Sequence, residues 1–169
     1  MRRIRYQVAV SLDGYIADSS GGTDWIVNEP EIDFEELFNQ FDTLLIGRLT
    51  YEGILPGSEG FWGKRVLVFS RTLRQADHPG VTVVADQIEQ TLKELRLQAG
   101  KDIWLFGGGE LFRSLLAAGC VDTVEPAIIP VLLGSGTPFL PAPSVQARLS
   151  LTKKRVYPSG IVWLDYDVR

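Results

Sequence analysis

The chain carries the run Ile103-Trp104-Leu105-Phe106-Gly107-Gly108-Gly109-Glu110-Leu111-Phe112. Its apolar part is typical of a buried strand, and the three glycines lead directly into a segment with helical spacing. A phosphate can approach a backbone that has no side chains, and the first N–H groups of a helix are unpaired. The run therefore indicates a phosphate or dinucleotide site. The alternative is a tight turn that needs positive φ at one or two glycines. The spacing is not GxGxxG, so an ordinary Rossmann domain is not implied.

Short apolar runs alternate with segments of helical spacing along the rest of the chain, which favours an α/β sheet. The predicted strands are Ile4–Val10, Thr43–Ile46, Arg65–Phe69, Val81–Val84, Asp102–Phe106 and Thr123–Leu133. The predicted helices are Glu31–Phe41, Asp86–Ala99 and Glu110–Ala118, with Asp86 as the cap of the second and Gly119 after the last. Leu149–Val156 and Ile161–Val168 flank a turn and predict an antiparallel hairpin. We expect a mostly parallel central sheet, flanked by helices and finished by this hairpin.

The composition excludes several classes of function. With 169 residues the chain predicts one domain, residues 1–169, and its 17 Lys and Arg against 21 Asp and Glu give a net charge of −4. Without a basic cluster, neither nucleic acid nor a membrane surface is an expected partner. One Cys and one His cannot form an intrachain disulfide or a structural zinc site. No signal-peptide core or membrane helix is recognisable, so we expect a cytoplasmic protein.

Two further strand ends resemble the first in form. Gly47-Arg48-Leu49-Thr50 and Ser70-Arg71-Thr72 each follow an apolar run and offer an arginine and hydroxyl groups. Parallel strands bring such loops to one edge of a sheet, where ligands bind beyond the carboxyl ends. A pyrophosphate at a helix N-terminus does not need two arginines, and a further phosphate, the 2′-phosphate of the adenosine ribose, would account for the additional positive charge. The three loops together therefore favour NADP(H) over NAD(H).

These three loops resemble, in order and spacing, the cofactor motifs of dihydrofolate reductases. The stretches Val8–Ala17 and Ile129–Phe139 are similar to the reductase domain of the bifunctional riboflavin-biosynthesis deaminase/reductase. Together the resemblance covers nearly the whole chain. It implies a dihydrofolate-reductase-like fold, NADPH as hydride donor, a small-molecule substrate and a homodimer.

The resemblance also implies which residues contact the cofactor. The glycine-rich run and Gly47, Arg48 and Thr50 would hold the phosphates, and Ser70, Arg71 and Thr72 the adenosine ribose and its 2′-phosphate. Alanine and isoleucine side chains near the N-terminus would border the nicotinamide. The full set is Ala9, Ile16, Ala17, Gly47, Arg48, Thr50, Ser70, Arg71, Thr72, Phe106, Gly107, Gly108, Gly109, Glu110 and Leu111.

The substrate side leaves alternatives open. Asp13 is a candidate for a polar contact or proton relay, or belongs to a tight Asp-Gly turn. Glu110 is a candidate acid, or is favoured at a helix start by the dipole alone. Trp25 is either a lid over a planar ring or a packed aromatic residue. Tyr51 begins the stretch 51–63, which is aromatic and acidic, has no positive charge and suits a flat neutral ring.

The sequence thus predicts an NADPH-dependent reductase of a small planar heterocycle, resembling 5-amino-6-(5-phosphoribosylamino)uracil reductase. Tyr15 follows Asp13-Gly14, where riboflavin reductases typically have a basic residue. A dihydrofolate or pterin reductase is therefore kept as an alternative, together with a nucleotide-binding module without turnover. A hydrolase that uses His78, which lies in an expected surface turn, is a third possibility.

Overall fold

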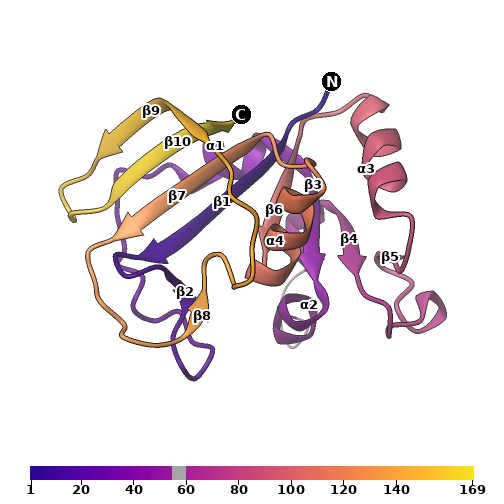
Figure 1. Cartoon of the computed structure of the whole chain (residues 1–169), viewed down its shortest axis with the longest axis horizontal. Coiled ribbons are helices and arrows are strands. Elements are labelled where there is room, and N and C mark those ends of the chain that lie inside the picture. Colours follow the sequence, from indigo (N-terminus) through magenta and orange to yellow (C-terminus); the bar gives the residue numbers. More distant parts are fainter. Residues whose placement is uncertain (55–59) are drawn as a thin grey trace.

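The computed structural model describes residues 1–54 and 60–169. Within these ranges, one mixed sheet of eight strands forms the centre of the molecule (Figure 1). The strands are β1 (Ile4–Ser11), β3 (Phe41–Gly47), β4 (Arg65–Phe69), β5 (Thr82–Val84), β6 (Asp102–Gly107), β7 (Thr123–Ile129), β9 (Leu149–Val156) and β10 (Val162–Val168). Their spatial order is β5-β4-β3-β6-β1-β7-β10-β9. The first six in the spatial order are parallel to their neighbours, and β10 is antiparallel to both β7 and β9. The predicted α/β architecture with its terminal hairpin is confirmed.

Among the described residues, four α-helices cover the two faces of this sheet: α1 (Phe34–Asn39), α2 (Arg48–Ile54), α3 (Ile88–Leu97) and α4 (Gly109–Ala117). Alternate residues of each central strand face opposite cores, as the pleat of a strand requires. Leu45 of β3 packs in the core that includes α3 and α4, whereas Leu44 and Ile46 pack in the core that includes α2. The continuous apolar runs therefore do mark strands that are covered on both faces.

Some element ends differ from the prediction. The first helix begins at Phe34 and ends at Asn39, because Phe41 instead starts β3 and is 1% exposed. Asp33 caps this helix by accepting a hydrogen bond of 2.9 Å from the N–H of Glu36. The second helix begins after Gln87, whose φ is 48° and whose side chain makes no capping bond, so the predicted capping by Asp86 is wrong. The third helix matches, and Gly119 follows it with φ of 65°.

Strand β7 ends at Ile129 and not at Leu133, because the Val131 N–H bonds locally to the Ile129 oxygen at 2.8 Å and the chain turns out of the strand. The chain beyond it forms a loop that leads to β8 (Thr137–Pro138). Strand β8 pairs antiparallel with β2 (Tyr15–Ala17), and these two short strands form a separate sheet beside β1 (Figure 1). The predicted segments around Val8–Ala17 and Ile129–Phe139 thus lie side by side.

Strands β1 and β6 are paired only at their beginnings, where Ile4 to Tyr6 oppose Ile103 to Leu105. Beyond this point no register is shared, although β1 continues to Ser11 and β6 to Gly107. The indole N–H of Trp104 donates a hydrogen bond of 2.9 Å to the backbone oxygen of Gln7. The Trp104 side chain thus bonds to a β1 oxygen that β6 no longer pairs with, and the two strands separate toward their carboxyl ends.

Candidate functional site

A cavity of about 1810 Å³ lies where the sheet opens, at the carboxyl ends of β1, β3, β4, β5 and β6. The three loops that the sequence singled out all contribute to it. Of the predicted cofactor residues, those that line the cavity are Ala9, Ile16, Ala17, Gly47, Arg48, Thr50, Ser70, Arg71, Phe106, Gly107, Gly108, Gly109, Glu110 and Leu111. Thr72 does not line it, and its hydroxyl group instead lies 3.2 Å from that of Ser70.

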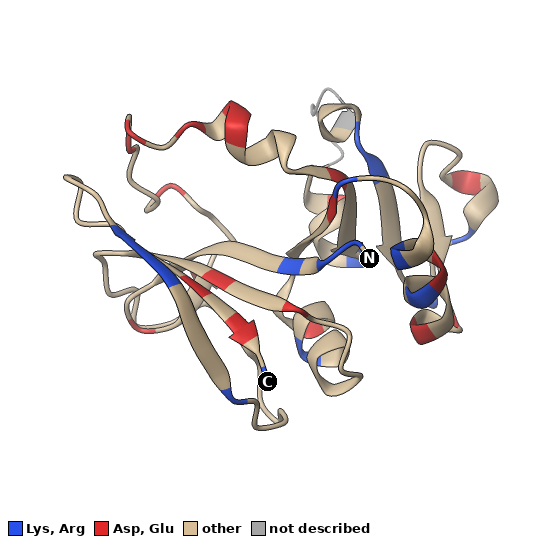
Figure 2. Ribbon diagram, turned by 90° about the horizontal axis from the view of Figure 1, so that it is seen from above, with Lys and Arg blue, Asp and Glu red and all other residues tan. Residues whose placement is uncertain are grey.

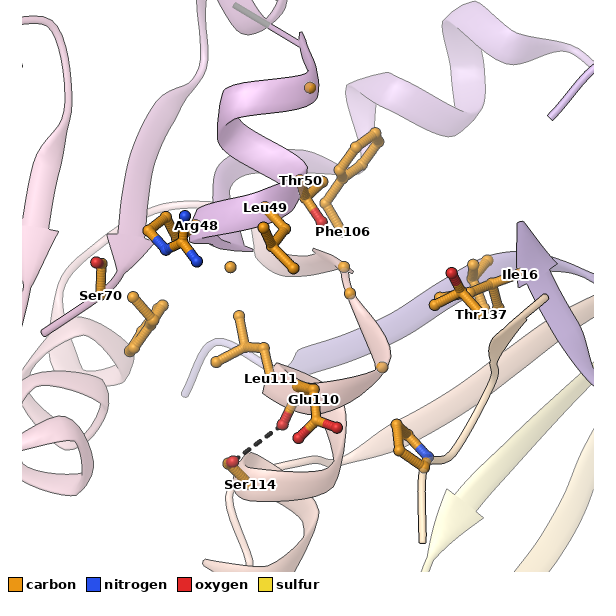
Figure 3. Close-up of a pocket in the computed structure, with 18 of the residues that line it drawn as sticks. Ile16, Arg48, Leu49, Thr50, Ser70, Phe106, Glu110, Leu111, Ser114 and Thr137 are labelled. Carbon is orange, nitrogen blue, oxygen red and sulfur yellow. Dashed lines mark hydrogen bonds between the residues drawn. The ribbon is translucent and has the colours of Figure 1, made fainter. Parts of the chain in front are cut away.

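The cavity is elongated between two groups of residues (Figure 3). Arg48 and Ser70 lie at one end, and Ile16 and Thr137 lie at the other. Leu49, Thr50, Phe106 and Leu111 lie between them. The charged end is built by the loops after β3 and β4, whereas the far end is built by β2 and β8. One cavity thus joins a polar region to an apolar one.

The glycine-rich turn has different reasons for its three glycines. Gly107 has φ of 151°, a conformation that side chains rarely adopt. A Cβ on Gly109 would lie 2.5 Å from the backbone oxygen of Pro138, so no larger residue fits there. A Cβ on Gly108 would meet only the hydroxyl group of Thr50, at 3.4 Å, and both residues line the cavity. The turn itself would therefore tolerate a side chain at Gly108, and the missing side chain at this position instead keeps space open in the cavity.

Helix α4 begins at this turn, and its N-cap residue, Gly108, has no side chain that could accept a hydrogen bond from the first N–H groups of the helix. The Phe112 N–H donates to the Gly108 oxygen at 3.1 Å, which closes the first turn of the helix. The N–H groups before Phe112 have no acceptor within the helix, and such groups favour an anion. Gly109, Glu110 and Leu111 at this end all line the cavity. The Gly107–Gly108 peptide bond, which leads into the helix, is cis.

The polar end of the cavity carries two arginines, the half-buried Arg48 at the start of α2 and the exposed Arg71 in the loop after β4. The Arg48 guanidinium pairs with Glu52 one turn later, with an N–O distance of 2.7 Å. Ser70 accepts backbone hydrogen bonds of 3.1 Å from Thr72 and Leu73, which fixes the loop that carries Arg71. The chain thus presents two guanidinium groups, one from each of two adjacent strand ends.

Asp13 lies in a turn and does not line the cavity. Its carboxylate accepts hydrogen bonds from the Ser11 hydroxyl at 2.6 Å and from the backbone N–H groups of Leu133 and Gly134 at 3.1 and 2.7 Å. The Ser11 hydrogen bond and these N–H groups lower the pKa of Asp13 below its usual 3.8. The structure thus shows Asp13 in the tight Asp-Gly turn, one of the two roles that the sequence leaves open, and its role in catalysis stays a prediction.

The other predicted substrate-side residues are distributed differently. Glu110 lines the cavity, but its side chain is 68% exposed and pairs with Arg113, while its backbone oxygen accepts the Ser114 hydroxyl at 2.9 Å (Figure 3). Trp25 is half-buried, donates a hydrogen bond of 3.1 Å to the oxygen of Gly22 and is not in the lining. Glu110 thus lines the cavity with its carboxylate paired to Arg113, whereas the ring of Trp25 lies outside the lining.

Tyr51 also lies outside the lining, and the residue is 4% exposed. It stacks on Phe61 with ring centroids 6.0 Å apart, and its hydroxyl lies 3.0 Å from Nδ1 of His78. His78 is therefore half-buried against a tyrosine and away from the cavity, not a solvated loop residue. Of the predicted ring-binding stretch 51–63, residues 55–59 lie outside the described residues, while Gly53 and Ile54 line the cavity.

Many of the lining residues were not predicted from the sequence, and two groups of them lie at the polar end and where β1 and β6 part. The segment Ala85–Gln90 and Lys93 enter the polar end from the β5–α3 connection. The sequence could have indicated them, because this connection follows a parallel strand, and the ends of parallel strands lie at the same edge of the sheet. Gln7 and Trp104 line the cavity where β1 and β6 part. Gln7 could have been noticed as an amide in an apolar strand, but the parting of the strands is a tertiary feature.

In the ranges 1–54 and 60–169, no three His, Cys, Asp or Glu side chains gather as a metal site would require. Among the helices of the same ranges, none combines the length and the apolar character needed to span a membrane.

The fold and the cavity define an α/β protein with a large cavity at the carboxyl ends of parallel strands. Residues 2–163 match the RibD C-terminal domain, and the chain belongs to this family. It is 33% identical over 178 residues to the uncharacterized protein YyaP of Bacillus subtilis (strain 168), and the match covers 98% of this chain and 94% of that protein. The resemblance to the riboflavin-type reductase domain is thereby confirmed.

Solved structures agree with this assignment. A putative riboflavin biosynthesis protein from Shewanella sp. PV-4 superposes with a TM-score of 0.84 at 26% identity, covering 100% of this chain and 99% of that one. The diaminohydroxyphosphoribosylaminopyrimidine deaminase/5-amino-6-(5-phosphoribosylamino)uracil reductase of Thermotoga maritima has a TM-score of 0.75 at 19% identity. The match covers 99% of this chain but only 57% of the Thermotoga chain, so this second likeness shows the fold alone.

Proposed function

We propose that this protein is an NADPH-dependent reductase of a small planar heterocycle. The observation that carries the proposal is the cavity that joins Arg48, Arg71 and the uncapped N-terminus of α4 to an apolar region beside β1. A dinucleotide has this same division, with phosphates at one end and a neutral ring at the other. The chain belongs to the RibD C-terminal domain family, and the Shewanella protein at 26% identity is named as a putative riboflavin biosynthesis protein, which supports a reductase of this kind.

The residues present fit NADPH. Gly108 leaves room for a phosphate beside the uncapped end of α4, and the arginines of the polar end would neutralise phosphate charge. Arg48 and Arg71 would hold the 2′-phosphate, while Ala9, Ile16 and Ala17 would border the nicotinamide. When bound, the cofactor supplies the hydride, and the protein provides position and the exclusion of water.

The substrate would bind in the apolar half of the cavity. Val8, Leu49, Ile54, Trp104 and Phe106 line the cavity and offer apolar or aromatic surface. The sequence from 51 to 63 contains no Lys or Arg that could hold a ribose phosphate. A neutral planar ring of the pyrimidine or pterin kind therefore fits this half. The family resemblance implies reduction of 5-amino-6-(5-phosphoribosylamino)uracil, whereas the absence of Lys and Arg from 51–63 favours the second candidate, reduction of dihydrofolate or another pterin.

Two measurements test the proposal. Tryptophan fluorescence and thermal shift should respond to NADPH, since Trp104 lines the cavity. The absence of any response to millimolar NADPH and NADH would refute it. NADPH oxidation against a panel of pterins, pyrimidines and quinones should then identify a ring that is reduced.

A nucleotide-binding module without turnover is the second candidate. It is favoured by the states of the two predicted acids, since Asp13 is bound in a turn and Glu110 pairs with Arg113. Tight NADPH binding with no oxidation across the panel would support it over the reductase. The homodimer that the resemblance implies stays a prediction, which sedimentation equilibrium tests.

A further inference from the structure

Strands β7, β10 and β9 have an apolar face at the end of the sheet that the terminal hairpin forms. Successive residues of a strand point to opposite sides of a sheet. On one side β10 presents Val162, Leu164 and Tyr166, and the neighbouring strands place further apolar residues beside them. The residues of this apolar face are Pro126, Ile128, Leu149, Leu151, Val156, Val162, Leu164 and Tyr166.

The apolar face lies on the same side of the sheet as α4 but is not covered by it. Val124 lies opposite Tyr166 in the β7–β10 register and packs in the core that includes Leu115 of α4. Figure 1 shows that α4 lies over the middle of the sheet and not over β10 and β9. Within the described part of the chain, none of the eight residues belongs to a hydrophobic core. The three on the edge strand, Leu149, Leu151 and Val156, are 42, 52 and 73% exposed.

The alternation along the hairpin marks this face for burial. An antiparallel sheet with one solvated face places its apolar residues toward the protein and its polar residues toward water. In β10 the charged residues are Asp165 and Asp167, which point away from the apolar face. Figure 2 shows the acidic residues of β10 beside basic residues of β9, and Asp165 pairs with Arg155 at 2.8 Å. The charged side is thus paired within the chain, whereas the apolar side has no covering element among the described residues.

We propose that the apolar face binds the same face of a second copy of this chain. The inference gives the homodimer, which so far is implied only by the family resemblance, a defined surface. It does not rest on the proposed reductase function, since none of the eight residues lines the cavity. Around a twofold axis the same patch meets itself, so each copy buries the apolar side chains of the other. Two sheet faces pack in this way about 10 Å apart.

Charge and area favour a second copy over other partners. Among the residues that the described strands β7, β9 and β10 direct to this side, Lys154 is the one charged residue, and it lies opposite Leu164. A nucleic acid or an anionic membrane surface would require a cluster of cations. The eight residues present on the order of 500 Å² of apolar surface, as large as the largest patches of monomeric proteins. A standard interface takes about 800 Å² from each partner, so this face would form its centre and the polar surroundings its rim.

Sedimentation equilibrium of the unmodified protein is the first test. We expect a species of twice the chain mass of 18.8 kDa at micromolar concentration. A protein that stays monomeric up to its solubility limit would overturn the inference. Vesicles of phosphatidylglycerol test the other occupant of an apolar face with a basic residue. A monomer that sediments with these vesicles would assign the face to a membrane surface and would also overturn the inference.

Two variants then place the contact on the apolar face. Leu151→Lys and Val156→Lys change side chains that are more than half exposed, so both proteins should fold, which circular dichroism checks. Each change occurs twice in a twofold dimer and buries lysines without partners, so the dissociation constant should rise by about 100-fold or more. Leu97→Lys is the matched control, because Leu97 is 72% exposed at the end of α3, away from this face (Figure 1), and it should leave the dimer intact. A dimer that both folded variants retain at full affinity would disprove this interface.

Discussion

The carboxylate of Asp13 accepts a hydrogen bond of 2.7 Å from the backbone N–H of Gly134, which lies 121 residues further along the chain. The bond ties the turn after β1 to the loop before β8. Strands β2 and β8 leave these two segments and pair with each other. Ile16 and Thr137, one on each strand, line the apolar end of the cavity (Figure 3). Asp13 therefore positions a wall of the site that it does not itself touch.

Asp13→Asn is expected to lower Tm by a few degrees at neutral pH and to weaken NADPH binding. The pKa of Asp13 is lowered by its hydrogen bonds, so the ionised form stabilises the folded state. This contribution is present above the unfolded value of 3.8 and is lost as the pH falls through the lower, folded value. The difference in Tm between the two proteins should therefore shrink below about pH 4.

Asp24→Asn is the matched control for this comparison, because Asp24 is an exposed acid on a neighbouring loop. Differential scanning calorimetry of the three proteins across this pH range measures the effect. A Tm difference for Asp13→Asn that does not change with pH would contradict the role of the ionised carboxylate.

Arg48→Ala and Arg71→Ala should each weaken NADPH more than NADH. Both guanidinium groups lie at the polar end of the cavity, and a 2′-phosphate is the group that distinguishes the two cofactors. Because solvent screens these side chains, we expect a loss of about tenfold for NADPH. Fluorescence titration measures both affinities. Arg74→Ala, an exposed arginine outside the lining, should change neither, whereas equal losses for the two cofactors would refute the assignment.

The glycines of the turn before α4 should respond differently to alanine. In Gly109→Ala the new Cβ would lie 2.5 Å from the Pro138 oxygen, so the backbone must move and stability should fall by about 2 kcal/mol or more. Gly108→Ala should fold normally, since its Cβ meets only the Thr50 hydroxyl at 3.4 Å, but the methyl group should obstruct NADPH. Urea denaturation and NADPH titration separate the effects. Full NADPH affinity in Gly108→Ala would exclude a phosphate at this turn.

The elements with local signals could be predicted from the sequence. The eight strands of the central sheet and α4 are recognisable because apolar runs, glycines and a helical stripe lie within a few residues of one another. The rule that parallel strands end at one edge is sufficient to group Arg48, Ser70 and Gly107, and all three line the cavity. The predicted first helix is too long because Phe41 fits a helical stripe as well as a strand, and only pairing with β6 decides between them.

The substrate side could not be predicted for the same reason. Asp13 reads as a catalytic acid or a turn residue until Gly134, far along the chain, is placed beside it. Tyr51 reads as a ring contact until the chain folds it against His78. Each of these depends on contacts between distant segments.

His78→Ala should leave cofactor binding and NADPH oxidation unchanged, because the ring contacts Tyr51 and does not line the cavity. It should lower the free energy of unfolding by about 1 kcal/mol, since the Tyr51 hydroxyl loses its partner in a part-buried position. Tyr51→Phe removes the same bond from the other side and should cost a similar amount. The double variant should lose less than the sum of the two, because both changes remove one interaction. Urea denaturation and steady-state oxidation measure these effects, and loss of turnover in His78→Ala at unchanged stability would restore a catalytic role for the histidine.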